Sequence, residues 1–111
     1  MKIEVDERDG ATVVVIEGDV DMSTAPELRQ SLQRLVSDSK SPIFIDLSLV
    51  PYIDSSGLAT LVECYQGTKR FKGTMVLTGL SETVMEVFRM THLDKHFSIY
   101  QSLEEGVNAV G

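Results

Sequence analysis

The sequence predicts an α/β fold in which about four helices pack on a mixed β-sheet of about five strands, in one domain spanning residues 1–111. Short apolar segments with strand character alternate with longer segments in which apolar residues recur at helical spacing. Residues 43–47 are almost continuously apolar, which is typical of an inner strand covered on both faces. Near the start of the chain, Asp9 and Gly10 separate two alternating segments, as in a β-hairpin.

The first half of the chain continues from this hairpin into a helix. Residues 3–5 alternate between apolar and polar, and residues 12–16 are expected to form a second, more buried strand. Residues 18–23 are rich in turn-forming residues, which predicts a loop. Residues 24–27, Thr-Ala-Pro-Glu, have the pattern of a capping box and predict a helix that runs to about Ser37.

The second half continues the alternation of strands and helices. The helix after the inner strand ends near Phe71, and its inward stripe consists of Leu58, Leu61, Val62 and Tyr65. Residues 74–78 form another buried strand, after which Ser81 caps a short helix. Residues 97–100 form an edge strand, and a second capping box at residues 102–105 opens the last helix. The predicted order is therefore β-β-α-β-α-β-α-β-α, with parallel strands after the hairpin.

Charge and cysteine content exclude several classes of partner. The formal net charge is −7 and there is no basic cluster, which argues against nucleic acid or an anionic membrane as the main partner. No apolar run is long enough to cross a bilayer, and the acidic N-terminal segment lacks the pattern of a signal peptide. The single Cys64 excludes an internal disulfide and fits a reducing compartment. We therefore expect a cytoplasmic protein.

Three loops that follow strands are expected to meet at the carboxyl edge of the sheet, where sites in open α/β folds form. These loops comprise residues 18–23, 48–54 and 78–81. They bring Asp21, Asp46 and Asp54 near one another, and three carboxylates could bind Mg²⁺. Turn formation and helix capping account for these three positions better, so no metal is predicted.

Enzymatic chemistry is not supported by the remaining candidates. Ser55 and Ser56 lack a Gly-x-Ser-x-Gly motif, and His92 and His96 are expected at the opposite edge of the sheet, out of reach as bases. The two histidines lie at a helix end and a turn, which favours surface residues over metal ligands. No glycine pattern for nucleotide phosphates is present. The sequence thus predicts no catalytic residue, cofactor or metal.

Asp54-Ser55-Ser56-Gly57 is the most informative motif. Aspartate is a preferred helix N-cap, so Asp54 alone would satisfy the first turn and the serines need another explanation. The positive end of the helix dipole favours negative charge, so a phosphate would be tolerated at this position. An ideal helical wheel places Ser56 further from the apolar stripe than Ser55, which favours Ser56 as the accessible hydroxyl.

Residues 46–58 resemble the signature of STAS domains, specifically those of bacterial anti-sigma factor antagonists. Residues 18–25 are similar to that family's Gly-Glu/Asp-hydrophobic-Asp loop, and residues 90–97 to the stretch before its last strand. The resemblance covers essentially the whole chain and implies a STAS-like fold. Ala59 is a departure, because many relatives carry a second glycine there.

The resemblance implies a protein without catalytic activity. Its unphosphorylated form would bind an anti-sigma factor that is also a serine kinase, and so release a sigma factor. That kinase would phosphorylate Ser55, the serine directly after the motif's Asp54, and so block binding, and a PP2C-type phosphatase would reverse the step. On this basis we prefer Ser55 to Ser56. The implied partner-binding residues are Asp21, Met22, Ser23, Thr24, Asp54, Ser56 and Gly57, with Asp46 in support.

Some STAS domains have other roles. The alternative is therefore an adaptor subunit of a stress-signalling or transport complex that is not phosphorylated. Such an adaptor would bind its partner regardless of kinase and ATP. The hydroxyl at Ser55 favours the phosphorylated branch of the family.

Overall fold

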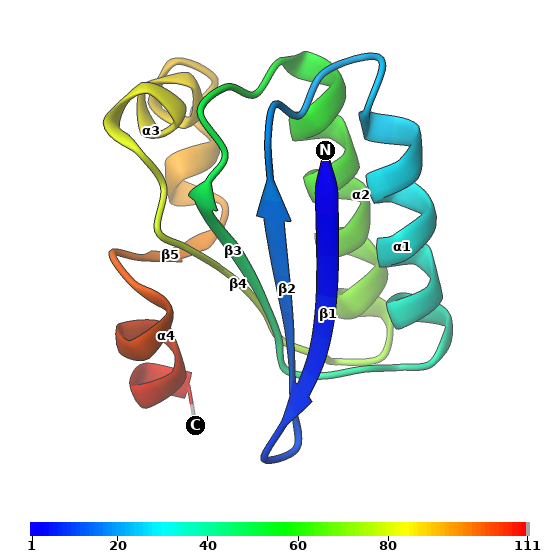
Figure 1. Ribbon diagram of the computed structural model, residues 1–111. Helices are drawn as coiled ribbons and strands as arrows, with labels where there is room; N and C mark the ends of the chain where they lie inside the picture. The colour runs from blue at the N-terminus through cyan, green and yellow to red at the C-terminus, as the bar shows by residue number, and fades with distance from the viewer. Residues whose placement is uncertain (111) are drawn as a thin grey trace.

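In the computed structural model, which describes residues 1–110, five strands form one mixed sheet in the order β1-β2-β3-β4-β5 (Figure 1). The strands are β1 (Lys2–Arg8), β2 (Ala11–Glu17), β3 (Ile43–Leu49), β4 (Met75–Thr78) and β5 (Ser98–Tyr100). The helices are α1 (Ala25–Ser37), α2 (Ser55–Arg70), α3 (Glu82–Met90), a 3₁₀ turn (Leu93–Lys95) and α4 (Leu103–Val110). β1 pairs antiparallel with β2, and the other neighbours are parallel. The predicted fold class and element order are confirmed.

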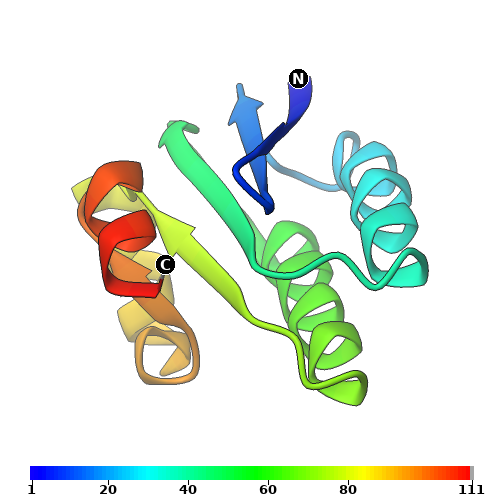
Figure 2. The same cartoon turned by 90° about the horizontal axis from the view of Figure 1, so that it is seen from below.

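Helices cover the two faces of the sheet unequally. Figure 2 shows α1 and α2 on one side of the strands and α4 on the other. Residues alternate along β3 accordingly: Ile43, Ile45 and Leu47 join the large core beneath α1 and α2, whereas Phe44 joins a smaller cluster with Leu103 of α4. The inner strand is therefore covered on both faces, as its apolar sequence predicts.

The start of α1 differs from the predicted capping box. Thr24 occupies the N-cap position, but its side chain makes no capping hydrogen bond. Its hydroxyl instead accepts the N–H of Asp21 at 2.9 Å and donates to the carbonyl of Asp19 at 2.9 Å. The Thr24 hydroxyl therefore stabilises the loop before α1 instead of capping the helix, because the loop brings the backbone groups of Asp19 and Asp21 within hydrogen-bond distance of it. The predicted caps of α3 and α4 are present: Ser81 and Ser102 accept the N–H groups of Val84 and Glu105.

α2 is buried on a broader face than the predicted stripe. Val62 and Tyr65 are only half-buried. A second side of the helix is covered by α1, and the buried residues of α2 that border α1 are Thr60, Cys64 and Gly67. Gly67 allows this contact, because a Cβ at that position would lie 2.8 Å from the side chain of Val36. Burial raises the pKa of the Cys64 thiol to about 12, so this cysteine stays protonated near neutral pH.

Within residues 1–110 no helix is long and apolar enough to cross a membrane.

Candidate functional site at the carboxyl edge

Two loops that are more than thirty residues apart in sequence are joined by backbone hydrogen bonds at the carboxyl edge of β2 and β3. Val20 and Ile53 form an isolated parallel bridge, and both side chains are buried. The N–H of Val20 donates to Tyr52 at 2.9 Å, and the N–H of Asp54 donates back to Val20 at 3.1 Å. These bonds therefore hold the loop before α1 and the loop before α2 together as one unit, which we call the ledge.

Asp54 holds this ledge to the start of α2. Its Oδ1 accepts the N–H groups of Ser56 at 2.9 Å and Gly57 at 3.2 Å, so it is the predicted N-cap. Its Oδ2 accepts the N–H of Met22 at 3.2 Å, across from the other loop. One carboxylate thus fixes both the helix terminus and the neighbouring loop.

Gly57 packs directly on the Val20–Ile53 bridge. A Cβ at this position would lie 2.7 Å from Ile53 Cγ1, 2.8 Å from Val20 Cγ1 and 3.0 Å from the Val20 carbonyl oxygen. The two carbon–carbon distances are shorter than van der Waals contact allows, so any larger residue would force Ile53 and Val20 to shift. Gly57 is buried and exposes no side chain to a partner. Within the domain, Gly57 therefore has a packing role.

Asp21 organises the loop before α1. Its Oδ1 accepts the hydroxyl of Ser23 at 2.6 Å, the N–H of Ser23 at 2.9 Å and the N–H of Thr24 at 3.2 Å. The hydrogen bond from the Ser23 hydroxyl, together with those from the backbone, lowers the pKa of Asp21 below its ordinary value. Asp21 is therefore an ionised turn-former, and Met22 beside it is left pointing into solvent with 77% of its surface exposed.

The two serines of the motif differ in exposure. Ser55 is exposed, whereas Ser56 is half-buried, so the helical wheel ranked the two serines in the wrong order. The helical wheel measures distance only from the stripe that faces the sheet. Because α1 covers a second side of α2, where Ser56 and Thr60 lie, Ser56 is the less exposed of the two serines. Both serines border a surface hollow of about 410 Å³ between the two helices. Its other lining residues are Met22, Ala25, Pro26, Arg29 and Ala59.

Asp46 does not join the other two carboxylates. It alternates with Ile45 and Leu47 on β3, so it lies on the opposite face of the sheet from α2. Its Oδ1 accepts the N–H of Ser48 at 3.0 Å. In the part of the chain that the structure describes, no group of three or more His, Cys, Asp or Glu side chains is arranged to hold a metal ion.

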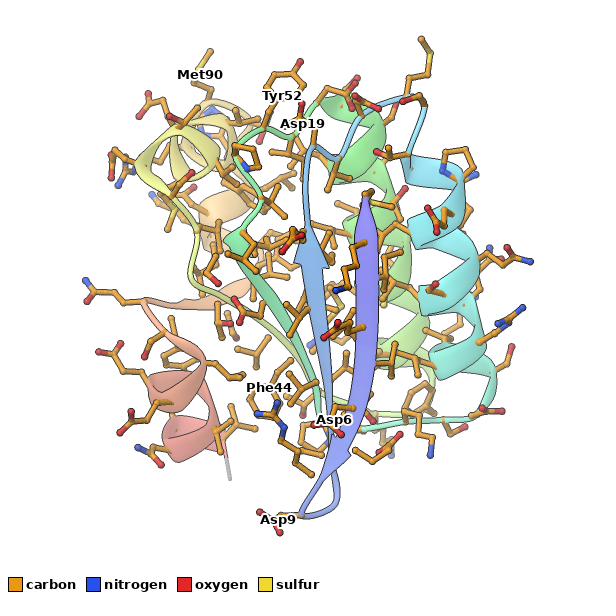
Figure 3. All side chains as sticks on the ribbon, viewed as in Figure 1. Asp6, Asp9, Asp19, Phe44, Tyr52 and Met90 are labelled. Atoms are coloured by element: carbon orange, nitrogen blue, oxygen red, sulfur yellow. The ribbon has the colours of Figure 1, made fainter. Side chains whose placement is uncertain are left out.

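The histidines lie away from the serines. β5 begins at Ser98 opposite Val76, near the amino end of β4, so His96 lies toward the opposite edge of the sheet, as predicted. Met90, the last residue of the nine-residue α3, lies at the other end, the one that carries Tyr52 and Asp19 (Figure 3). His96 packs against the ring of Tyr65, with the ring centroids 4.8 Å apart. Tyr65 lies ten residues beyond Ser55 on α2, which corresponds to about 15 Å along the helix axis.

Sequence reasoning missed two contributors to this site. Val20 is fully buried and anchors the ledge, although it was assigned only to a loop. The sequence does contain a sign of this burial, because Val20 is an apolar residue between two aspartates in an otherwise polar loop. Arg29 of α1 also borders the hollow, and its Nε lies 3.3 Å from Glu63 Oε2. No sequence pattern predicts that Arg29 lies near the two serines.

Comparison with known proteins agrees with this architecture. Residues 2–106 match the STAS domain family. The chain belongs to the STAS domain family. A relative named anti-sigma-B factor antagonist from Listeria monocytogenes is 31% identical over 84% of this chain and 82% of its own length. A Bacillus subtilis relative of the same name is 31% identical over 96% of this chain and 97% of its own.

Solved structures of STAS proteins superpose closely on this chain. The crystal structure of an anti-sigma factor antagonist from Mycobacterium paratuberculosis is 32% identical, with a TM-score of 0.92. The match covers 98% of this chain and 92% of that chain. The STAS fold and the similarity to anti-sigma factor antagonists that the sequence predicts are confirmed.

Removing the Asp54 carboxylate is expected to destabilise this STAS domain. Asp54→Ala should lower the free energy of unfolding by about 2 kcal/mol, because the variant loses both the helix cap and the bond to Met22. Urea denaturation followed by circular dichroism measures the change. Asp19→Ala is the matched control, since the exposed Asp19 carboxylate makes no hydrogen bond to residues 1–110. Equal stability of the two variants would contradict the assignment.

Proposed function

We propose that this protein is a cytoplasmic anti-sigma factor antagonist whose partner binding is switched by phosphorylation of Ser55. The unmodified form binds an anti-sigma factor with serine kinase activity and releases the sigma factor. The kinase phosphorylates Ser55, and a PP2C-type phosphatase removes the phosphate. The names of the two relatives and of the Mycobacterium paratuberculosis structure support the antagonist role. The protein itself performs no catalysis in this scheme.

The observation that carries the choice of residue is the exposure of Ser55 at the first position of α2, directly after the capping Asp54. A kinase must bring the serine oxygen to the nucleotide, so the target hydroxyl must be accessible in the folded domain. Ser56 is half-buried between α1 and α2 and is a poorer substrate for that reason. The partner surface proposed around Ser55 comprises Asp21, Met22, Ser23, Thr24, Asp54 and Ser56, and Gly57 holds it in place.

The phosphate acts on the interface and leaves the fold intact. It adds about −1.5 to −2 charges at neutral pH. In the free domain, the helix dipole stabilises that charge by about 0.3–1 kcal/mol, which the neighbouring Asp54 carboxylate opposes. Arg29 is already paired with Glu63 and supplies little compensation. Covering the phosphate with a partner removes its water, and without matched cations that costs several kcal/mol.

Kinase mapping tests the proposal. Wild type, Ser55→Ala and Ser56→Ala are each incubated with ATP and the candidate anti-sigma kinases of the same organism, and the peptide that contains both serines is sequenced by mass spectrometry. We expect phosphate on Ser55 in wild type and in Ser56→Ala, and none in Ser55→Ala. Modification confined to Ser56 would contradict the choice of residue. Tight binding of a partner regardless of ATP, with no modification, would favour the non-phosphorylated adaptor.

A further inference from the structure

Exposed apolar side chains are concentrated at the end of the molecule that carries Ser55. Six large apolar residues are exposed among residues 1–110, and the two outside this end are Val5 and Val107. The other four are Met22, Leu49, Tyr52 and Met90. Met22 and Tyr52 lie on the two joined loops, and Leu49 ends β3. Figure 3 places Tyr52 and Met90 at the same end. We call these four residues the apolar edge.

The degree of exposure sets these side chains apart from ordinary surface residues. Met22 and Met90 expose 77% and 73% of their surfaces, and Leu49 and Tyr52 about half. Single exposed apolar residues are common, but their gathering on one end marks an interaction surface. Methionine adapts its shape to a partner, and tyrosine is enriched among the residues that dominate binding energy.

The charge around the apolar edge specifies the partner further. Around Met22, Leu49 and Tyr52, residues 17–24 and 48–56 carry four carboxylates and contain no lysine, arginine or histidine. The carboxylates are Glu17, Asp19, Asp21 and Asp54. Beside Met90, Arg89 is paired with Glu82 and Glu86, and His92 and Lys95 follow in the sequence. Asp21 and Asp54 are held by backbone hydrogen bonds, so their charges are fixed in place before any partner arrives. A complementary surface must carry apolar pockets bordered by lysine or arginine.

We infer that Met22, Leu49, Tyr52 and Met90 are the anchors by which this chain docks onto a basic, apolar-pocketed surface of its protein partner. The inference rests on the proposed function, since the partner is the anti-sigma factor, and it extends the binding surface beyond the two loops to the end of α3. Ser55 then lies beside the anchors, so a phosphate there is covered whenever the anchors are seated. The partner's cations are already paired with Asp21 and Asp54, so they leave this phosphate without a matched cation. The anchors supply affinity, and the carboxylates supply orientation and salt dependence.

Binding measurements with a triple variant test this inference. Met22→Ser, Tyr52→Ser and Met90→Ser are combined, and affinity for each purified candidate anti-sigma factor is measured by isothermal titration calorimetry. We expect the affinity to fall by roughly a hundredfold or more, since residues of this kind contribute most of the binding energy at interfaces. Val5→Ser/Val107→Ser removes exposed apolar surface elsewhere and should change affinity by less than about twofold. Thermal melting verifies that both variants fold, and Tyr52→Ser alone provides a milder version of the test.

The outcomes separate this inference from the proposed function. Equal affinity of wild type and the triple variant would contradict the inference that the apolar edge anchors the partner, and would leave the proposed antagonist role unaffected. Failure of wild type to bind any of the candidates overturns both. Self-association of wild type through this edge, lost in the triple variant and detected by sedimentation, shows that a second copy is the occupant and overturns the assigned partner. Affinity that is unaffected by added salt contradicts the basic character of the partner surface.

Discussion

A Ser55→Asp variant is expected to bind the anti-sigma factor at least roughly a hundredfold more weakly than wild type, whereas Ser55→Ala should bind as tightly as wild type. Desolvating an unpaired negative charge at an interface costs about 3 kcal/mol or more, which corresponds to this loss. Ser55 is exposed and begins α2, so neither substitution disturbs the core. Isothermal titration calorimetry measures both affinities.

The control for this prediction is Ser98→Asp, which adds the same charge at an exposed position on edge strand β5. It should bind like wild type, because Ser98 lies opposite Val76 near the amino end of β4, whereas Ser55 begins α2 at the carboxyl edge of the sheet. Phosphorylated wild type should match Ser55→Asp or bind more weakly, since phosphate carries the larger charge. Undiminished binding by Ser55→Asp and by the phosphorylated protein would remove the basis for a switch at this residue.

Enlarging Gly57 is expected to destabilise the domain severely. Gly57→Val should lower the free energy of unfolding by about 3 kcal/mol or more, because its side chain would overlap Ile53 and Val20. Gly57→Ala should cost less, about 1–2 kcal/mol, since alanine's better helix propensity offsets part of the overlap. Urea denaturation measures both.

The matched control is Ala59→Val, two residues along the same helix but exposed. It should lose only about 0.5 kcal/mol, the ordinary helix-propensity difference. If Gly57→Val proved as stable as Ala59→Val, the ledge formed by Val20 and Ile53 would have to be free to move. Phosphorylation of Ser55 should also fail in the destabilised variant, because its presentation depends on that ledge.

Local patterns in the sequence were enough to predict the order of elements and the helix starts. The hairpin at Asp9-Gly10, the cap at Asp54 and the cap at Ser81 each depend on residues within a few positions of one another. Periodicity could not predict how α1 covers α2, which buries Thr60 and Gly67 and leaves Ser55 as the exposed serine. That coverage depends on packing between segments about thirty residues apart.

The sequence by itself determined the α/β class, the order of elements along the chain, the parallel direction of the strands after the hairpin and the presence of a serine-rich helix start. Only the tertiary structure decided which residues share the site. In the folded domain the N–H of Met22 donates to the Asp54 carboxylate and Gly57 packs against Val20. Asp46 lies on the opposite face of the sheet from α2. The physical reason is that helix periods and caps are local, whereas a site at a sheet edge is assembled from loops that meet only when parallel strands pair.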